Sequence, residues 1–207
     1  MPFAFPSHVG LIAPLWRRWP RIFDMPALCI GAMMPDVVDG VIGITRGHLG
    51  QTWGHTLLGM TFLCVPFGVP LWMGLHRWAA RARLKAGEGF WARSWNHGVR
   101  SVRAAAGRGW GVVLWSLLVG AFSHLFFDLL SHGERHGGFK WFLPWDVRLD
   151  IFPDWWNHEW FRMPVPGYLN GYAFAPHFLA WCGFTVLGAW MLFRPVLRRD
   201  DQATRPE

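Results

Sequence analysis

Several apolar runs in this chain are long enough to cross a bilayer, and one of them carries ionisable residues at a regular spacing. Residues 115–136 read WSLLVGAFSHLFFDLLSHGERH, with His124, Asp128 and His132 at steps of four. Four residues is close to one helical turn, so these side chains would lie along one stripe of a helix. An ionised carboxylate in hydrocarbon is costly unless it has a partner, a water-filled cavity or a metal. The run therefore predicts a membrane helix that carries a polar site.

The composition also indicates a membrane protein. Of 207 residues, 52% are hydrophobic and 16% are charged, whereas about a quarter of a soluble domain is charged. The best apolar runs are 56–76, 110–131 and 174–193, each near the ~20 residues of a crossing helix. Residues 22–45 are long enough but contain Pro35, which is expected to kink or end the helix. Residues 7–16 are too short for a full crossing.

These runs predict an all-α fold, a polytopic membrane helical bundle of about five membrane segments with the first short or re-entrant. Residues 1–207 are expected to form a single membrane-embedded domain. Basic residues orient it, because the stretch from Arg77 to Arg108 holds eight Lys or Arg and one acidic residue, and such clusters stay on the cytoplasmic side. Residues 77–109 then form a basic cytoplasmic loop, residues 132–173 a Trp-rich external loop, and residues 194–207 a cytoplasmic tail.

The expected location is the bacterial inner membrane, with the C-terminus cytoplasmic and membrane lipid around the helices. The formal charge of +7 invites a nucleic-acid interpretation. However, the basic residues flank apolar segments and no recognised nucleic-acid-binding motif accompanies them. We therefore predict no nucleic-acid partner.

In this topology, ionisable residues from distant parts of the chain fall at one depth, in the outer half of the membrane. They are His8, Asp36, Asp39, His55, His124, Asp128 and His132. A His and an Asp one turn apart can bind the same cation, as zinc and similar metals accept. A divalent metal would also cancel the carboxylate charge that makes burial costly.

We therefore predict a site for one or two divalent ions, with zinc as the favoured metal. The predicted ligands are His8, Asp36, His55, His124 and Asp128. Asp39 and His132 are candidate helpers. Asp39 could equally be an ordinary helix-end residue, and His132, before Gly133, could cap the helix or face water.

Four sequence blocks resemble an uncharacterised bacterial family of multi-helix membrane proteins that begin Met-Pro-Phe. The blocks are MPFAFPSHVGLIAP, CIGAMMPDVVDG, GHTLLG and LLVGAFSHLFFDLLSHG, and together they cover most of residues 1–135. More distantly, the set is similar to the inner-membrane metal-dependent hydrolases. A looser similarity is to the all-helical zinc phospholipase C and nuclease group, which cuts phosphoesters.

The resemblance implies metal-ligating roles for His8, Asp36, His55, and the pair His124 and Asp128. The distant hydrolases have Thr-His where this chain has Gly54-His55, and often a further Asp-His where it reads Asp39-Gly40. Because of these departures, the resemblance does not determine which residues surround the ligands or whether a second metal binds.

The leading functional hypothesis is a membrane-bound metal-dependent hydrolase acting on a phosphoester or lipid-linked substrate at the outer face of the membrane. Metal can activate water and polarise a phosphoryl oxygen, so no protein nucleophile is needed. One alternative is an ion or proton transporter that uses the intramembrane His and Asp residues. A second is a non-catalytic membrane scaffold, and a minor one is a haem protein.

Overall fold

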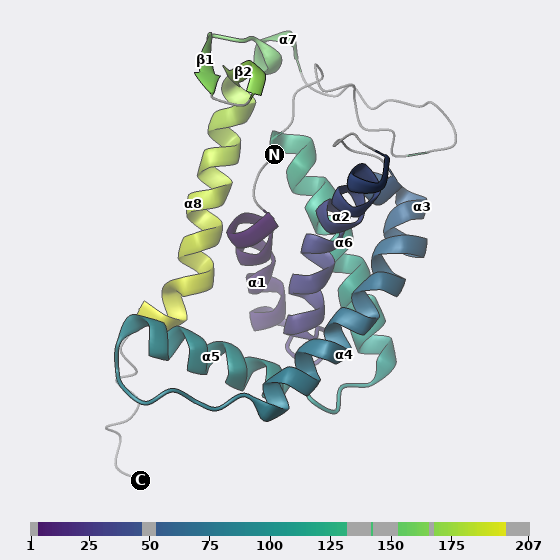
Figure 1. The fold of residues 1–207 in the computed structure, drawn as a ribbon, viewed down its shortest axis with the longest axis vertical. Helices are drawn as coiled ribbons and strands as arrows, with labels where there is room; N and C mark the ends of the chain where they lie inside the picture. Colours follow the sequence, from purple (N-terminus) through teal and green to yellow (C-terminus); the bar gives the residue numbers. More distant parts are fainter. Residues whose placement is uncertain (1–3, 47–52, 132–141, 143–152, 166–167, 198–207) are drawn as a thin grey trace.

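The structure is a computed structural model that describes residues 4–46, 53–131, 142, 153–165 and 168–197. Within these residues the fold is all-α apart from one two-stranded hairpin (Figure 1). Four helical stretches of this described part are long and apolar enough to cross a membrane: Met25–Ile42, Leu57–Arg81, Trp110–Leu129 and Pro176–Leu197. The chain therefore has the architecture of a multi-pass membrane protein, as predicted.

The elements follow the predicted runs, with ends shifted by a few residues. In chain order they are η1 (Ala4–His8), α1 (Val9–Arg18), α2 (Met25–Arg46), η2 (Trp53–His55), α3 (Leu57–Gly59), η3 (Met60–Cys64), α4 (Val65–Arg81), α5 (Phe90–Ala104), α6 (Trp110–Ser131), α7 (Asp154–Asn157), β1 (Phe161–Val165), β2 (Tyr168–Phe174) and α8 (Pro176–Leu197). The helical stretch from α3 to α4 is continuous and forms one crossing segment.

The first two helices differ in their ability to span a bilayer. α1 has 10 residues, a rise of about 15 Å at 1.5 Å per residue, which is half of the hydrocarbon core. α2 does not end at Pro35, as the sequence suggested it could, but continues to Arg46. Proline is tolerated inside membrane helices because neighbouring helices compensate for the lost backbone hydrogen bond, and α2 packs extensively against α6.

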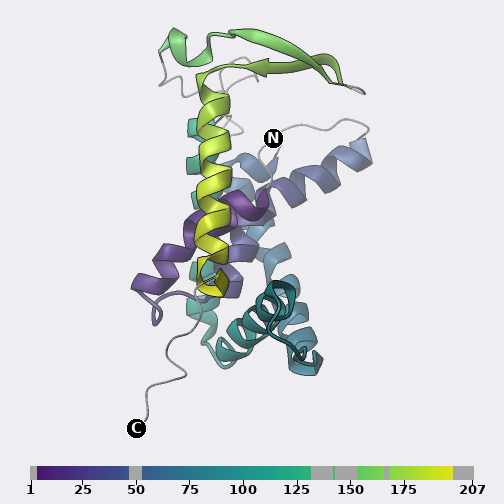
Figure 2. The same cartoon turned by 90° about the vertical axis from the view of Figure 1, so that its left-hand side faces the viewer.

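The two ends of the bundle carry different structures. α5 lies across the end of the bundle near the C-terminus, within the predicted basic loop (Figure 1). The hairpin β1–β2 lies crosswise at the opposite end of α8 (Figure 2), and its strands are antiparallel with Phe161 opposite Phe174. Predicted loops on both sides thus contain regular structure, which the composition of these segments did not reveal.

Small residues let the central helices approach closely. A Cβ atom added to Gly31 would lie 2.2 Å from the carbonyl oxygen of Leu117, and one added to Gly120 would lie 2.4 Å from that of Leu28. α2 and α6 therefore touch backbone to backbone, as helices in membranes do when small residues face each other. This contact sets the two helices that carry most of the polar residues side by side.

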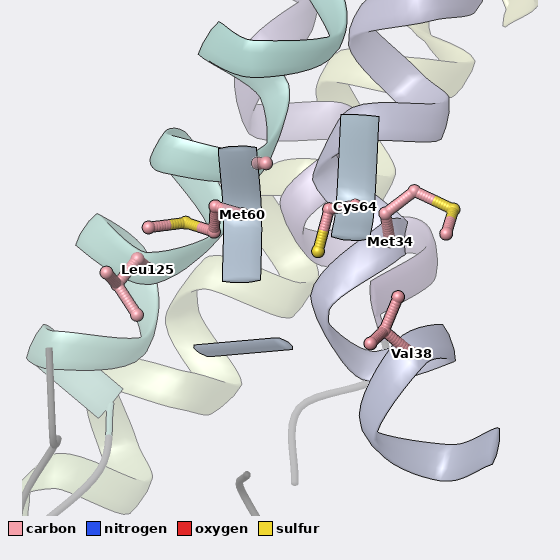
Figure 3. Close-up of a cluster of buried hydrophobic side chains, with 6 residues drawn as sticks. Met34, Val38, Met60, Cys64 and Leu125 are labelled. Atoms are coloured by element: carbon pink, nitrogen blue, oxygen red, sulfur yellow. The ribbon is translucent and has the colours of Figure 1, made fainter. Parts of the chain in front are cut away.

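Apolar side chains fill the space between α2, η3, α4 and α6. One cluster consists of Met34, Val38, Met60, Cys64, Ala121 and Leu125 (Figure 3). A second, closer to α5, is formed by Ala27, Val113 and Leu117 with partly buried neighbours from α4. These clusters make a continuous apolar layer through the bundle.

Asp24 is a buried carboxylate that directly precedes α2, beside the apolar cluster of Ala27, Val113 and Leu117. Its Oδ1 accepts hydrogen bonds from the backbone N–H of Ala27 at 2.8 Å and from Nε1 of Trp72 at 3.1 Å. Its own backbone N–H donates to Oγ of Ser116 at 2.8 Å. Asp24 therefore caps the start of α2 and ties it to α4 and α6, a role that the sequence analysis did not predict.

Replacing Asp24 with Ala should destabilise the bundle. The change removes the cap and leaves the Trp72 indole N–H without its acceptor, which together should cost about 1 to 3 kcal/mol of unfolding free energy. Thermal unfolding of the detergent-purified protein measures this loss, with the exposed Asp154 changed to Ala as the control. Equal melting temperatures for the two variants would contradict the role assigned to Asp24.

Candidate metal centre

His124 presents one ring nitrogen to the interior of the bundle. It lies in α6 and is 0% exposed. Its Nδ1 is 2.7 Å from the carbonyl oxygen of Ala32, in the turn of α2 before Pro35. A carbonyl oxygen only accepts hydrogen bonds, so Nδ1 carries the proton and donates it. When the ring is neutral, Nε2 therefore offers its lone pair on the opposite side.

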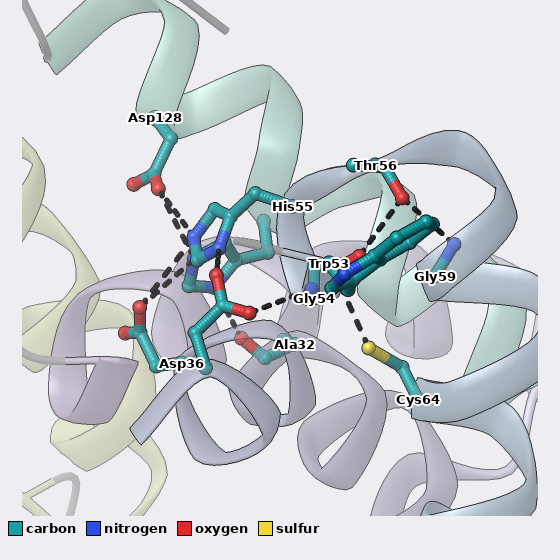
Figure 4. Close-up of polar contacts among 11 residues, drawn as sticks. Ala32, Asp36, Trp53, Gly54, His55, Thr56, Gly59, Cys64 and Asp128 are labelled. Atoms are coloured by element: carbon teal, nitrogen blue, oxygen red, sulfur yellow. Dashed lines mark hydrogen bonds and ion pairs between the residues drawn. The ribbon is translucent and has the colours of Figure 1, made fainter. Parts of the chain in front are cut away.

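His55 is fixed in the same way by a carboxylate. Its Nδ1 lies 2.7 Å from Oδ2 of Asp39, and Oδ1 of Asp39 accepts the backbone N–H of Gly54 at 2.6 Å. A carboxylate oxygen beside Nδ1 accepts its proton, which again leaves Nε2 with a lone pair. The following residue, Thr56, caps α3 by accepting the N–H of Gly59 at 2.9 Å, so the turn that carries His55 is held from both sides (Figure 4).

The two Nε2 atoms face each other together with two carboxylates. They are 3.2 Å apart, and Oδ2 of Asp128 lies 3.2 Å from each of them. Oδ1 of Asp36 lies 3.6 Å from each of them. In Figure 4, Asp36 and Asp128 approach His55 from different sides. When both rings are neutral, the two nitrogens and the two carboxylate oxygens all offer electron pairs, and they repel unless a cation lies among them.

The distances among these atoms suit metal ligation. Two ligand atoms at about 2.1 Å from a tetrahedral zinc ion are about 3.4 Å from each other. The two Nε2 atoms lie 3.2 Å apart and 3.2 to 3.6 Å from Oδ2 of Asp128 and Oδ1 of Asp36. Asp36, His55 and His124 form one trio that could hold an ion. Two imidazole nitrogens and two carboxylate oxygens also suit zinc and other first-row divalent metals. The residues could thus hold a metal ion with little rearrangement.

His8 adds a fifth donor at the edge of this group. Its ring stacks on that of His124, with centroids 4.1 Å apart and planes at 23°. Its Nε2 lies 3.3 Å from Oδ1 of Asp128, although neither ring nitrogen makes a well-directed hydrogen bond within the described residues. Asp128 therefore faces His55 and His124 through one oxygen and His8 through the other. His8, His124 and Asp128 form a second trio that could hold an ion.

All five predicted ligands meet in this group, from η1, α2, η2 and α6. His8, His55, His124 and Asp128 are at most 3% exposed, whereas Asp36 is 24% exposed and is the most accessible of the five. Of the two candidate helpers, Asp39 contacts His55, and His132 lies outside the described residues. His177, by contrast, lies near Trp156 at the hairpin end of α8 and takes no part in the group.

The sequence comparison gives the family of the chain. A family model described as a domain of unknown function, DUF4184, matches residues 1–205. The chain belongs to the DUF4184 family. Because the match covers nearly the whole length, the DUF4184 domain includes the crossing helices and all five converging residues. No curated protein and no solved structure matches the chain.

Changing Asp39 to Asn should weaken metal binding without removing it. The amide can still accept through one oxygen, but it no longer supplies a negative charge beside the Nδ1–H of His55, so the Nε2 lone pair becomes less basic. Loss of such a supporting group typically costs 10- to 100-fold in metal affinity. Competition with a fluorescent zinc chelator measures the affinity, and an Asp154→Asn variant is the matched control. An unchanged affinity would show that Asp39 does not support His55.

Proposed function

We propose that this protein is a membrane-bound, metal-dependent hydrolase that acts on a phosphoester at the outer face of the bacterial inner membrane. The observation that carries the proposal is the pair of Nε2 atoms, of His55 and His124, held 3.2 Å apart beside the carboxylates of Asp36 and Asp128. Each histidine is oriented through its other nitrogen, which is the arrangement that metal-binding histidines use. The DUF4184 match assigns no activity, so the reaction is inferred from this chemistry.

The chain supplies the ligands and their orientation. His55, His124, Asp36 and Asp128 would hold the ion, and Asp39 keeps the His55 ring in place through Nδ1. A bound divalent ion supplies Lewis acidity that polarises a phosphoryl oxygen and lowers the pKa of water to about 7. The exposed edge of Asp36 gives a substrate its way in, while burial of the other ligands keeps bulk water from them.

Charge balance bears on the number of ions. Asp36, Asp39 and Asp128 bring three negative charges to the site, and one divalent ion leaves a net negative charge that would repel a phosphoester. A second divalent ion makes the site positive. His8 and the free side of Asp128 are placed to hold it, since paired metals in phosphoesterases lie about 3.5 to 4 Å apart and share ligands. We therefore propose a site for two ions, to which Asp128 would contribute one oxygen on the side of His55 and His124 and the other on the side of His8.

A transporter is less well supported than a hydrolase. Transport requires a polar path across the membrane, with ionisable groups facing it. Here Asp24, which caps the start of α2, and Asp36 within α2 lie twelve residues apart, about 18 Å along the helix axis. The space between them in the described part is filled by the apolar layer around Ala27, Val113 and Leu117.

Hydrolysis of bis(p-nitrophenyl) phosphate by the zinc-loaded protein in detergent tests the proposal. We expect His55→Ala to lower kcat/KM by about 100-fold or more, because a ligand that holds the Lewis acid is lost. His177→Ala should retain wild-type activity. Zinc flux into liposomes that depends on Asp128, without turnover, would establish the transporter instead. If the protein binds stoichiometric metal but shows neither phosphoester turnover nor zinc flux, the non-catalytic membrane scaffold would be the supported alternative.

A further inference from the structure

An apolar groove runs along the bundle between α1 and α6. Its volume is about 620 Å³, within the range of small-molecule binding sites. One wall includes Leu11 and Leu15 of α1, and the other includes Leu118 and Phe122 of α6. Trp115, Phe122 and Phe126 on this face of α6 are exposed, and α6 is a candidate crossing helix, so within a membrane the groove would open towards the hydrocarbon.

The groove follows the length of α6. Residues of this helix line it at intervals of three or four from Trp115 to Phe127, a stripe along one helix face. Twelve residues correspond to a rise of about 18 Å. An elongated apolar channel of this length fits an extended hydrocarbon chain better than a compact ligand.

One end of the groove adjoins the candidate metal centre. Ser123 and Phe127 line this end and directly precede His124 and Asp128 in α6. The ring of Phe127 also contacts that of His8, with centroids 6.0 Å apart. A chain lying in the groove would therefore place a polar group attached to its end beside the metal ligands.

We infer that the groove binds one acyl chain of a membrane phospholipid whose phosphoester group is the substrate of the site. The head-group part of this inference rests on the proposed function, while the chain-binding part rests on the groove alone. Divalent metal ions in the candidate metal centre would attract the anionic phosphate, and the apolar walls of the groove would contact the acyl chain. In this arrangement the acyl chain lies along α1 and α6, and its phosphoester group reaches the metal ligands.

Photocrosslinking separates this occupant from ordinary lipid contact. The protein is reconstituted in liposomes that contain a phospholipid with a diazirine on one acyl chain, and adducts are mapped by mass spectrometry. We expect peptides of α1 and α6 that line the groove to be labelled about tenfold more than the lipid-facing side of α8 around Val186, which is 70% exposed. Leu118→Trp should fill the groove and remove this excess, whereas Val186→Trp should leave it unchanged.

Each result of this experiment bears on the groove. Leu15→Phe fills the groove from the other wall and replaces Leu118→Trp if that variant does not fold. Uniform labelling, or groove labelling that survives both filling variants, would overturn the inference. Since labelling needs no turnover, groove labelling without phosphoester hydrolysis refutes only the hydrolase. Hydrolysis without groove labelling refutes only the lipid groove.

Discussion

Replacing Asp128 with Ala is expected to empty the metal centre. Asp128 is the only one of the converging residues whose two oxygens face ligands on both sides, His55 and His124 through Oδ2 and His8 through Oδ1. Its removal leaves the imidazole nitrogens without the carboxylate that all of them share. Elemental analysis of the detergent-purified protein should give two divalent ions per wild-type chain and fewer than about 0.1 per variant chain.

Two further variants sharpen this measurement. His8→Ala should keep the ion bound by His55, His124, Asp36 and Asp128, and so retain one ion per chain. Asp154→Ala, an exposed acid in α7, should retain both. A wild-type chain without stoichiometric metal, or an Asp128→Ala chain that keeps it, would remove the basis for the proposed hydrolase.

Replacing Gly10 with Val is expected to separate α1 from α8. A Cβ atom at Gly10 would lie 1.9 Å from the carbonyl oxygen of Gly188, which is backbone and cannot swing away. The helices would have to move apart, at a cost of about 3 kcal/mol or more in unfolding free energy. Because His8 directly precedes α1, the displacement should also lower the affinity for the second ion.

Gly74→Val is the matched control for this variant. Gly74 is also helical, but nothing lies within 4 Å of a Cβ added there, so the substitution changes only the helix propensity, which is slightly higher for valine than for glycine. Thermal unfolding in detergent and zinc titration should therefore distinguish the two variants clearly. Equal melting temperatures would mean that α8 tolerates a wider spacing from α1 than the contact implies.

The membrane helices could be predicted because their signal is local. A crossing helix must be apolar over about 20 residues, and the runs at 110–131 and 174–193 meet this condition without reference to any other part of the chain. The effect of Pro35 could not be predicted in this way. Whether a helix survives a proline depends on the helices packed around it, here α6 against α2.

The sequence could indicate which residues lie close together in the candidate metal centre, but it could not indicate which atoms contact one another. Histidines and aspartates are expensive at membrane depth, so their shared depth in the topology selected His8, Asp36, His55, His124 and Asp128. The partners of their other atoms depend on three-dimensional contacts. Only the structure shows that Nδ1 of His124 donates to Ala32 and that Asp39 supports His55.

The structural role of Asp24 was not predicted because nothing in the surrounding sequence indicates that this residue is buried. It follows a basic stretch, WRRWPRIFD, which reads as the hydrated edge of a membrane protein. Its partners Trp72 and Ser116 lie 48 and 92 residues further along the chain. A contact over that distance has no local sequence signal.

The close contact of Gly10 with Gly188 also sets an order of events during synthesis. The donors of the metal centre are complete in the nascent chain once Asp128 has left the ribosome, but the segment that fastens α1 against the bundle emerges some sixty residues later. Until α8 inserts, α1, which directly follows His8, lacks its packing contact with Gly188. Ribosome-bound chains that stop before α8 should therefore acquire the first ion and fail to retain the second.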